Sequence, residues 1–84
     1  MRWEVVLTRS ARKDLTALSK DARRRIDVRL LALEDDPFPR GVKKLKGNGD
    51  YRIAVGSYRI IYMIEERSRT VTVRYIRHRR EAYR

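Results

Sequence analysis

The 84-residue chain contains no cysteine and only one histidine, His78. A disulfide framework and a thiolate metal site are therefore excluded, and a single imidazole cannot build a histidine-rich metal centre. Both prolines and three of the four glycines lie between residues 34 and 50, so no second stretch has the composition of a linker. We expect one domain, residues 1–84, that works without a metal or any other cofactor.

Long hydrophobic runs are also absent. The apolar stretch near the start comprises Val5, Val6 and Leu7, which is too short for a signal peptide, and nowhere do eighteen apolar residues follow one another. We therefore expect a soluble, cytoplasmic protein with no membrane partner. A chain of this length buries only about 60% of the surface that it exposes when unfolded, so a deep enclosed pocket is not expected.

Positive charge is what the chain has in excess. There are 22 lysines and arginines against 11 aspartates and glutamates, a formal net charge of +11 at pH 7. Residues 1–42 hold 10 basic and 7 acidic residues, whereas residues 43–84 hold 12 basic and 4 acidic ones. A field of one sign attracts polyanions, so nucleic acid or a ribonucleoprotein is the favoured partner, with an acidic protein as the alternative.

The periodicity of apolar residues predicts a small α+β domain. Trp3, Val5 and Leu7 alternate with their neighbours, as in a strand with one face on a core. Helical spacing follows in two stretches joined near Ser19, with Thr8 or Ser10 as the first cap. The apolar positions of these stretches are Ala11, Leu15 and Leu18, then Ala22, Ile26, Leu30 and Leu33. Strand-like alternation resumes in residues 51–55, 58–65 and 70–77. The order is an N-terminal strand, a helix hairpin and a three-stranded antiparallel meander (β-α-α-β-β-β), with the helices over one face of the sheet.

The central hairpin, YRIAVGSYRIIY, carries two arginines. If Gly56-Ser57 is a two-residue loop, Arg52 and Arg59 both project from the face that the helices leave uncovered. As diagonal neighbours roughly 7 to 8 Å apart, they can reach one phosphodiester or two adjacent ones. The alternative is that their aliphatic stems only shield the second face of the sheet.

Further basic residues flank the hairpin. Lys43, Lys44 and Lys46 surround Leu45 directly before it, and we interpret them as phosphate contacts rather than as a solvated loop. The second helix carries a basic cluster that either faces solvent and pairs with nearby acids or faces nucleic acid. This cluster comprises Arg23, Arg24, Arg25 and Arg29.

The C-terminal segment RHRREAYR, residues 77–84, combines arginines with His78 and Tyr83. Nearby positive charge stabilises a phenolate, which would let Tyr83 act as a general base. His78 is the conventional acid or base, or else a partly exposed residue at a strand end with no chemical role. Glu81 can pair with a neighbouring arginine.

With the blocks KKLKG, YRIAVGSYRIIY and HRREAYR in this order, the chain resembles the RelE branch of the RelE/ParE toxin superfamily over nearly its whole length. The resemblance implies a fold like that of the microbial ribonucleases and a cognate antitoxin as partner. It also implies binding to the ribosome and cleavage of messenger RNA in the A site without a metal, which inhibits translation. Operator DNA, bound through the antitoxin complex, is a further partner that the resemblance suggests.

By the same resemblance, Arg59 stabilises charge on the scissile phosphate, Arg52 and Arg79 assist, and Tyr83 is the general base. Best-known members have a lysine where this chain has Ala54, a loss that Lys44, Lys46 or His78 would have to offset. The complete set of expected RNA contacts outside the catalytic group is Lys43, Lys44, Lys46, His78 and Arg80.

Two other functions fit the sequence. The first is a ParE-like poison of DNA gyrase, which shares the architecture but acts by binding; Arg59, Arg79 and Tyr83 argue against it. The second is a nucleic-acid-binding corepressor without catalysis. In that case, substitutions at Arg59 or Tyr83 would change salt-dependent binding and nothing more.

Overall fold

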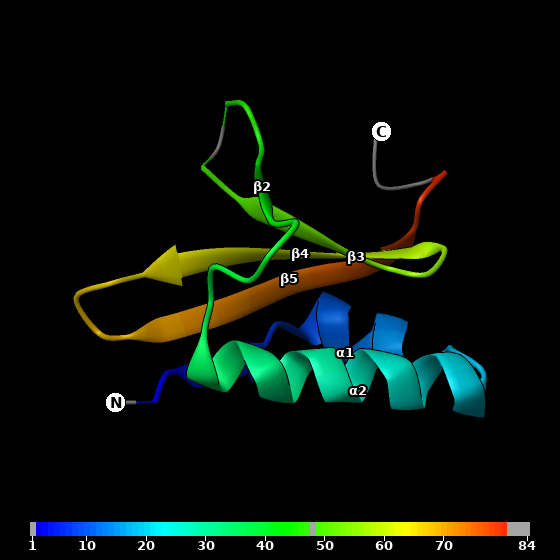
Figure 1. The fold of residues 1–84 in the computed structure, drawn as a ribbon. Helices are drawn as coiled ribbons and strands as arrows, with labels where there is room; N and C mark the ends of the chain where they lie inside the picture. The colour runs from blue at the N-terminus through cyan, green and yellow to red at the C-terminus, as the bar shows by residue number, and fades with distance from the viewer. Residues whose placement is uncertain (1, 48, 81–84) are drawn as a thin grey trace.

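The computed structural model describes residues 2–47 and 49–80. The elements in chain order are β1 (Glu4–Leu7), α1 (Arg9–Thr16), α2 (Lys20–Asp35), β2 (Lys43–Lys44), β3 (Tyr51–Val55), β4 (Tyr58–Glu65) and β5 (Thr70–His78). The strands form one sheet in the order β1-β5-β4-β3-β2, and both helices lie on the same side of it (Figure 1). The predicted α+β order is confirmed. The short strand β2 is an addition, within a stretch that the sequence indicated as a loop.

Two hydroxyl side chains cap the helices. The Thr8 hydroxyl accepts a hydrogen bond from the backbone N–H of Ala11, and the Ser19 hydroxyl accepts one from Ala22. Each cap satisfies an N–H that has no partner within its own helix, which typically contributes about 1 kcal/mol. Thr8 is therefore the cap of α1, one of the two residues that the sequence offered for this role.

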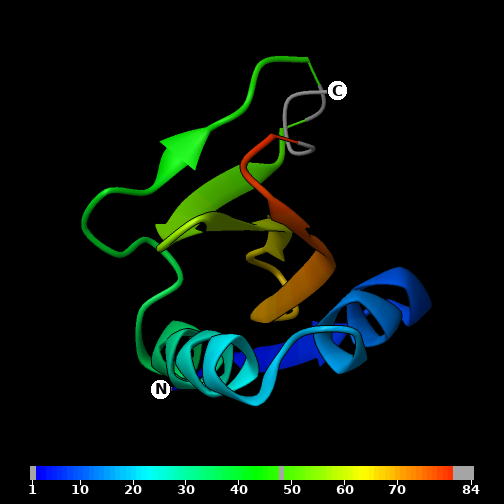
Figure 2. The ribbon, with the colours of Figure 1, turned by 90° about the vertical axis from the view of Figure 1, so that its right-hand side faces the viewer.

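The hydrophobic core lies between the helices and the sheet (Figure 2). Its largest fully buried members include Ile26 and Leu33 from α2 and Tyr62 from β4. The Tyr62 hydroxyl donates a 2.8 Å hydrogen bond to the carbonyl of Pro37, which ties the segment after α2 to the sheet. Burial raises the pKa of Tyr62 well above its ordinary value, so its ring is neutral and remains a donor.

The register of the β3–β4 hairpin is the predicted one, with Ala54 opposite Arg59 and Arg52 opposite Ile61. Between β4 and β5 the register shifts by one residue. Ile61 pairs with Tyr75 but Tyr62 pairs with Val73, which leaves Arg74 as the extra residue of a β-bulge. At the other edge of β5, β1 pairs with it in parallel.

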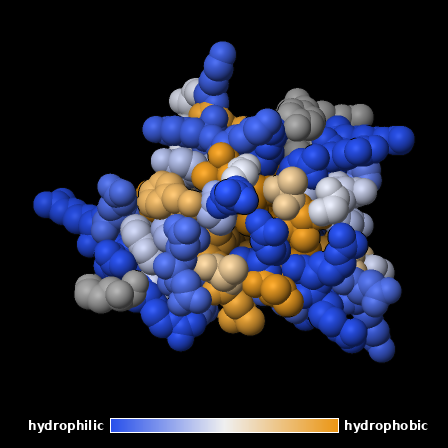
Figure 3. Space-filling view, viewed as in Figure 1, coloured by the Kyte–Doolittle hydropathy of each residue, from blue (hydrophilic) through white to orange (hydrophobic). Residues whose placement is uncertain are grey.

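We call the face of the sheet that the helices leave uncovered the open face. It is not as bare as the sequence suggested, because Ile61 lies on this face and is only 1% exposed. On the helix side, by contrast, Val28 and Leu31 of α2 remain 60% and 61% exposed, and Figure 3 shows a hydrophobic area over α2 on an otherwise mainly hydrophilic surface.

Within the described residues, neither helix has the length and apolar character needed to cross a membrane.

Candidate functional site

Cations from four neighbouring strands share the open face. Lys43 of β2 lies opposite Arg52 of β3, and Arg59 of β4 lies opposite Arg77 of β5. Directly opposed residues project to the same face, with Cβ atoms about 5 Å apart. The small side chain of Ala54, which pairs with Arg59 on the other side, leaves space beside it. These pairings bring the predicted residues Arg52 and Arg59 together on one surface.

The guanidinium of Arg59 is held by the hairpin loop. Its Nη1 donates to the carbonyls of Gly56 and Tyr58 at 3.0 and 2.9 Å. Gly56 has a φ of 60°, which favours glycine, and an added Cβ would lie 2.9 Å from Nη2 of Arg25. The basic helix α2 therefore contributes one arginine, Arg25, to the same end of the sheet. For this residue, that placement fits the second interpretation of the helix cluster, a face for nucleic acid.

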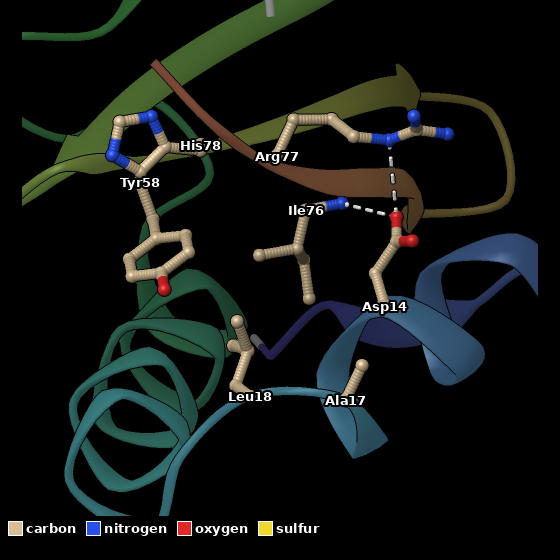
Figure 4. Close-up of a pocket in the computed structure, with 7 residues that line it drawn as sticks. All are labelled: Asp14, Ala17, Leu18, Tyr58, Ile76, Arg77 and His78. Carbon is tan, nitrogen blue, oxygen red and sulfur yellow. Dashed lines mark hydrogen bonds and ion pairs between the residues drawn. The ribbon is translucent and has the colours of Figure 1, made fainter. Parts of the chain in front are cut away.

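Arg77 is the functional candidate that sequence reasoning missed. Its Nε lies 3.3 Å from Oδ2 of Asp14 on α1, and its guanidinium lies over the ring of Tyr75, 4.9 Å from the centroid. The same Asp14 oxygen accepts a 3.0 Å hydrogen bond from the N–H of Ile76 (Figure 4). The pairing of β1 with β5 ends at Val73, so beyond that residue the edge of β5 has no neighbouring strand. The carboxylate of Asp14 accepts the hydrogen bond from Ile76 that a strand carbonyl would otherwise accept.

The residues after β5 are attached to the same hairpin loop. The N–H of Arg79 donates to the Ser57 carbonyl at 2.7 Å, so the backbone of Arg79 lies beside the loop that also holds Arg59. Arg79 and Arg80 are exposed. Tyr83, the predicted general base, lies outside the described residues, and its role stays a prediction.

His78 lies on the other side of the sheet. It pairs with Tyr58, whose ring it meets edge-on with centroids 5.7 Å apart, and its Nδ1 accepts a 3.3 Å hydrogen bond from the N–H of Arg80. The structure does not bring His78 together with Arg52 and Arg59. Of the three predicted lysines, Lys43 points to the open face. Lys44 pairs with Tyr51 and lies over its ring, and Lys46 is exposed in the turn after β2.

Two of the clefts among the described residues border the helices. One, of about 400 Å³, has Tyr58 and His78 on one wall and Asp14 and Arg77 on the other, as Figure 4 shows. The remaining lining residues are Ala17, Leu18 and Ile76. The second, of about 360 Å³, runs between β1 and α2 and is lined by Val5, Leu7, Asp27, Leu30, Leu31 and Glu34. Among residues 2–47 and 49–80, no group of three acidic or histidine side chains is placed to hold a metal ion.

A helix hairpin thus lies on one side of a five-stranded sheet, and cations from four strands lie on the other. The chain belongs to the family described as the ParE toxin of type II toxin–antitoxin systems, parDE, whose profile matches residues 5–83. It is 28% identical over 87 residues to toxin RelE1 of Methanocaldococcus jannaschii, covering 99% of this chain and 97% of the relative.

Solved structures give the same result. The RelE–RelB complex of Pyrococcus horikoshii OT3 matches with a TM-score of 0.85 and 30% identity, covering 96% of this chain and 99% of that one. The toxin–antitoxin complex RelBE2 of Mycobacterium tuberculosis matches with a TM-score of 0.84 and 26% identity, covering 93% and 99%. Membership of the RelE/ParE superfamily, expected from the sequence, is confirmed, and these structural relatives are RelE toxins.

Proposed function

We propose that this chain is a ribosome-dependent endoribonuclease that cleaves messenger RNA in the A site and so inhibits translation in the cytoplasm. The observation that carries the proposal is the register of three adjacent strands, which places Arg52, Arg59 and Arg77 on the open face. Arg79 is attached at the same end of the sheet through its bond to Ser57. An exposed, cationic surface of this kind suits a substrate whose backbone is negatively charged.

The proposed reaction is transesterification without a metal. The 2'-hydroxyl of the RNA attacks the adjacent phosphorus while its proton passes to the Tyr83 phenolate. The bond from phosphorus to the 5'-oxygen breaks and that oxygen takes a proton from solvent water, giving a cyclic phosphate and a free 5'-hydroxyl. Negative charge grows on the phosphoryl oxygens, and Arg59 with Arg52, Arg77 and Arg79 would offset it. Two backbone carbonyls already hold the guanidinium of Arg59, so this side chain loses less conformational entropy when substrate binds.

The ribosome is proposed as a partner because this surface is shallow. Orientation of the messenger has to come from elsewhere, and a ribosomal A site would supply it. A cognate antitoxin is the second proposed partner, since the P. horikoshii and M. tuberculosis relatives are toxin–antitoxin complexes. Operator DNA would be reached through that complex.

A second candidate function is a ParE-like poison of gyrase, which acts by binding. The family description, which names ParE, favours it. The placement of Arg59 opposite Arg77 supports the nuclease, because two cations on one surface can share the charge that grows on a phosphate during cleavage.

The test is a cell-free translation assay in which messenger 5' ends are mapped with and without ribosomes. We expect new 5' ends only when ribosomes are present, and a loss of about 10²-fold or more in cleavage for Arg59→Ala. Tyr83→Phe should slow cleavage strongly but leave ribosome binding intact. Arg67→Ala, an exposed arginine in the β4–β5 turn, is the matched control and should cut normally. Unchanged cutting by Arg59→Ala would reject the site, and gyrase-dependent damage without cutting would establish the second candidate.

A further inference from the structure

Asp50 is the one charged residue among the described residues that is fully buried, at 1% exposed, in a chain whose net charge is +11. A buried carboxylate needs a counter-charge, because removal from water penalises the ionised form. Asp50 immediately precedes β3, and Arg52 follows two residues later, so strand alternation directs both side chains to the open face. The acid therefore lies within the surface that gathers the cations.

One counter-charge comes from the β-bulge. Arg74 is the extra residue of β5, and its Nη1 lies 3.6 Å from Oδ2 of Asp50. Because β4 lies between β5 and β3 in the sheet, this ion pair spans β4 on the open face. Ile61 of β4 also lies on this face and is buried although no helix covers it. The backbone of the bulge is fixed as well, because the Thr8 hydroxyl donates a 2.6 Å hydrogen bond to the Arg74 carbonyl.

The backbone of Asp50 connects this ion pair to the basic segment Lys43–Lys46. The N–H of Leu45 donates a 2.7 Å hydrogen bond to the Asp50 carbonyl. Leu45 is flanked by Lys44 and Lys46, and Lys43 pairs with Arg52. The side chain of Asp50 is therefore bound to β5, and its main chain is bound to the segment that carries the lysines.

We propose that Asp50 is a positioning residue for nucleic-acid contacts of the open face: its ion pair with Arg74 holds the segment Lys43–Lys46 and Arg52 against the sheet. The inference rests on the proposed function, because it takes RNA as the ligand of that face. For the change in RNA affinity when Asp50 is neutralised, it predicts the opposite sign to the one that net charge alone predicts. Removing an acid raises the net positive charge and should tighten RNA binding, whereas loss of a positioning acid should weaken it.

The first measurement needs no RNA. Amide hydrogen exchange, read by NMR, reports whether the Leu45 N–H remains protected. In Asp50→Asn and in Arg74→Gln, we expect faster exchange at Leu45 with no change in the amides of α2. Asp50→Glu, which keeps the charge, should restore much of the protection. Unchanged exchange at Leu45 in both variants would overturn the inference.

The second measurement is the affinity of the full chain for a short, fluorescein-labelled single-stranded RNA, followed by fluorescence anisotropy. Asp50→Asn should bind about fivefold more weakly, as expected when one or two phosphate contacts lose their positions. Arg74→Gln should also bind more weakly, and the double variant should add little to the larger single effect. Glu66→Gln is the control, since this exposed acid in the β4–β5 turn undergoes the same change of charge and should not weaken binding.

The outcomes separate the two proposals. Equal or tighter RNA binding by Asp50→Asn would overturn the positioning role. If the unmodified chain bound no RNA, the proposed function and the RNA part of this inference would both fall. The exchange data, recorded without RNA, would still decide whether the ion pair holds the segment.

Discussion

Single residues of the open face are oriented by the protein itself. Two backbone carbonyls hold the guanidinium of Arg59, and Asp14 with the ring of Tyr75 holds that of Arg77. Arginine side chains are long and lose considerable rotamer freedom when they bind, so fixing them beforehand lowers the cost of binding. A lysine at either position would lack the several directed donors that allow one guanidinium to bond to the protein and to a phosphate together.

Tyr62 makes a prediction at this scale. Tyr62→Phe removes the hydroxyl that bonds to Pro37 and leaves a buried carbonyl without its donor, so the free energy of unfolding should fall by about 1 to 2 kcal/mol. The pKa of Tyr62 is raised in the folded state, so the unfolded chain loses this proton first and stability should fall as pH rises above about 10. Urea titrations at several pH values would check both effects. A variant as stable as the wild type, with the same decline at high pH, would contradict them.

Among the secondary-structure elements, β5 explains why the sequence predicted part of the site and missed the rest. The β3–β4 register followed from a two-residue loop, so the placement of Arg52 and Arg59 was predictable. The β4–β5 pairing starts with Glu65 opposite Thr70, and without a bulge it would place Ile76 opposite Arg59 and Arg77 on the helix side. The extra residue in β5 reverses this, because a slip of one position exchanges the two faces of a strand. Nothing in the local sequence around Arg74 marks a bulge.

The burial of Ile61 and Asp50 was unpredictable for a related reason. Asp50 pairs with Arg74, a residue distant in the chain, and Ile61 is buried on a face that no helix covers. The parallel pairing of β1 with β5, which sets the edge where Asp14 acts, is likewise a long-range feature. By contrast, the helix hairpin and its caps follow from local spacing and local hydrogen bonds, and these were predictable.

The two helix caps give a prediction at the scale of elements. Thr8 caps α1 and also donates its hydroxyl proton to the Arg74 carbonyl, whereas Ser19 only caps α2. Ser19→Ala should lower the free energy of unfolding by about 1 kcal/mol, and Thr8→Ala by about twice as much. Denaturant unfolding of both variants would measure this. Equal losses would show that the bond to the bulge contributes nothing.

For the whole molecule, the two sides have different characters. The open face gathers cations from β2, β3, β4 and β5, whereas the helix side has the exposed apolar residues Val28 and Leu31 and the cleft between β1 and α2. So small a domain cannot enclose a substrate, and its net charge of +11 works against compactness through self-repulsion. The paired acids Asp14 and Asp50, each beside an arginine, reduce that repulsion where the cations are most crowded.

The claim on which the account depends is that Arg59 and Arg77 act on one phosphate because the bulge places them opposite each other. The most direct test is the single-turnover rate of messenger cleavage on programmed ribosomes for the wild type, Arg59→Ala, Arg77→Ala and the double variant. We predict that each single substitution slows cleavage by about 10²-fold, and that the double variant is faster than the product of the two effects would give. A wild-type rate for Arg77→Ala alongside a slow Arg59→Ala would contradict the account.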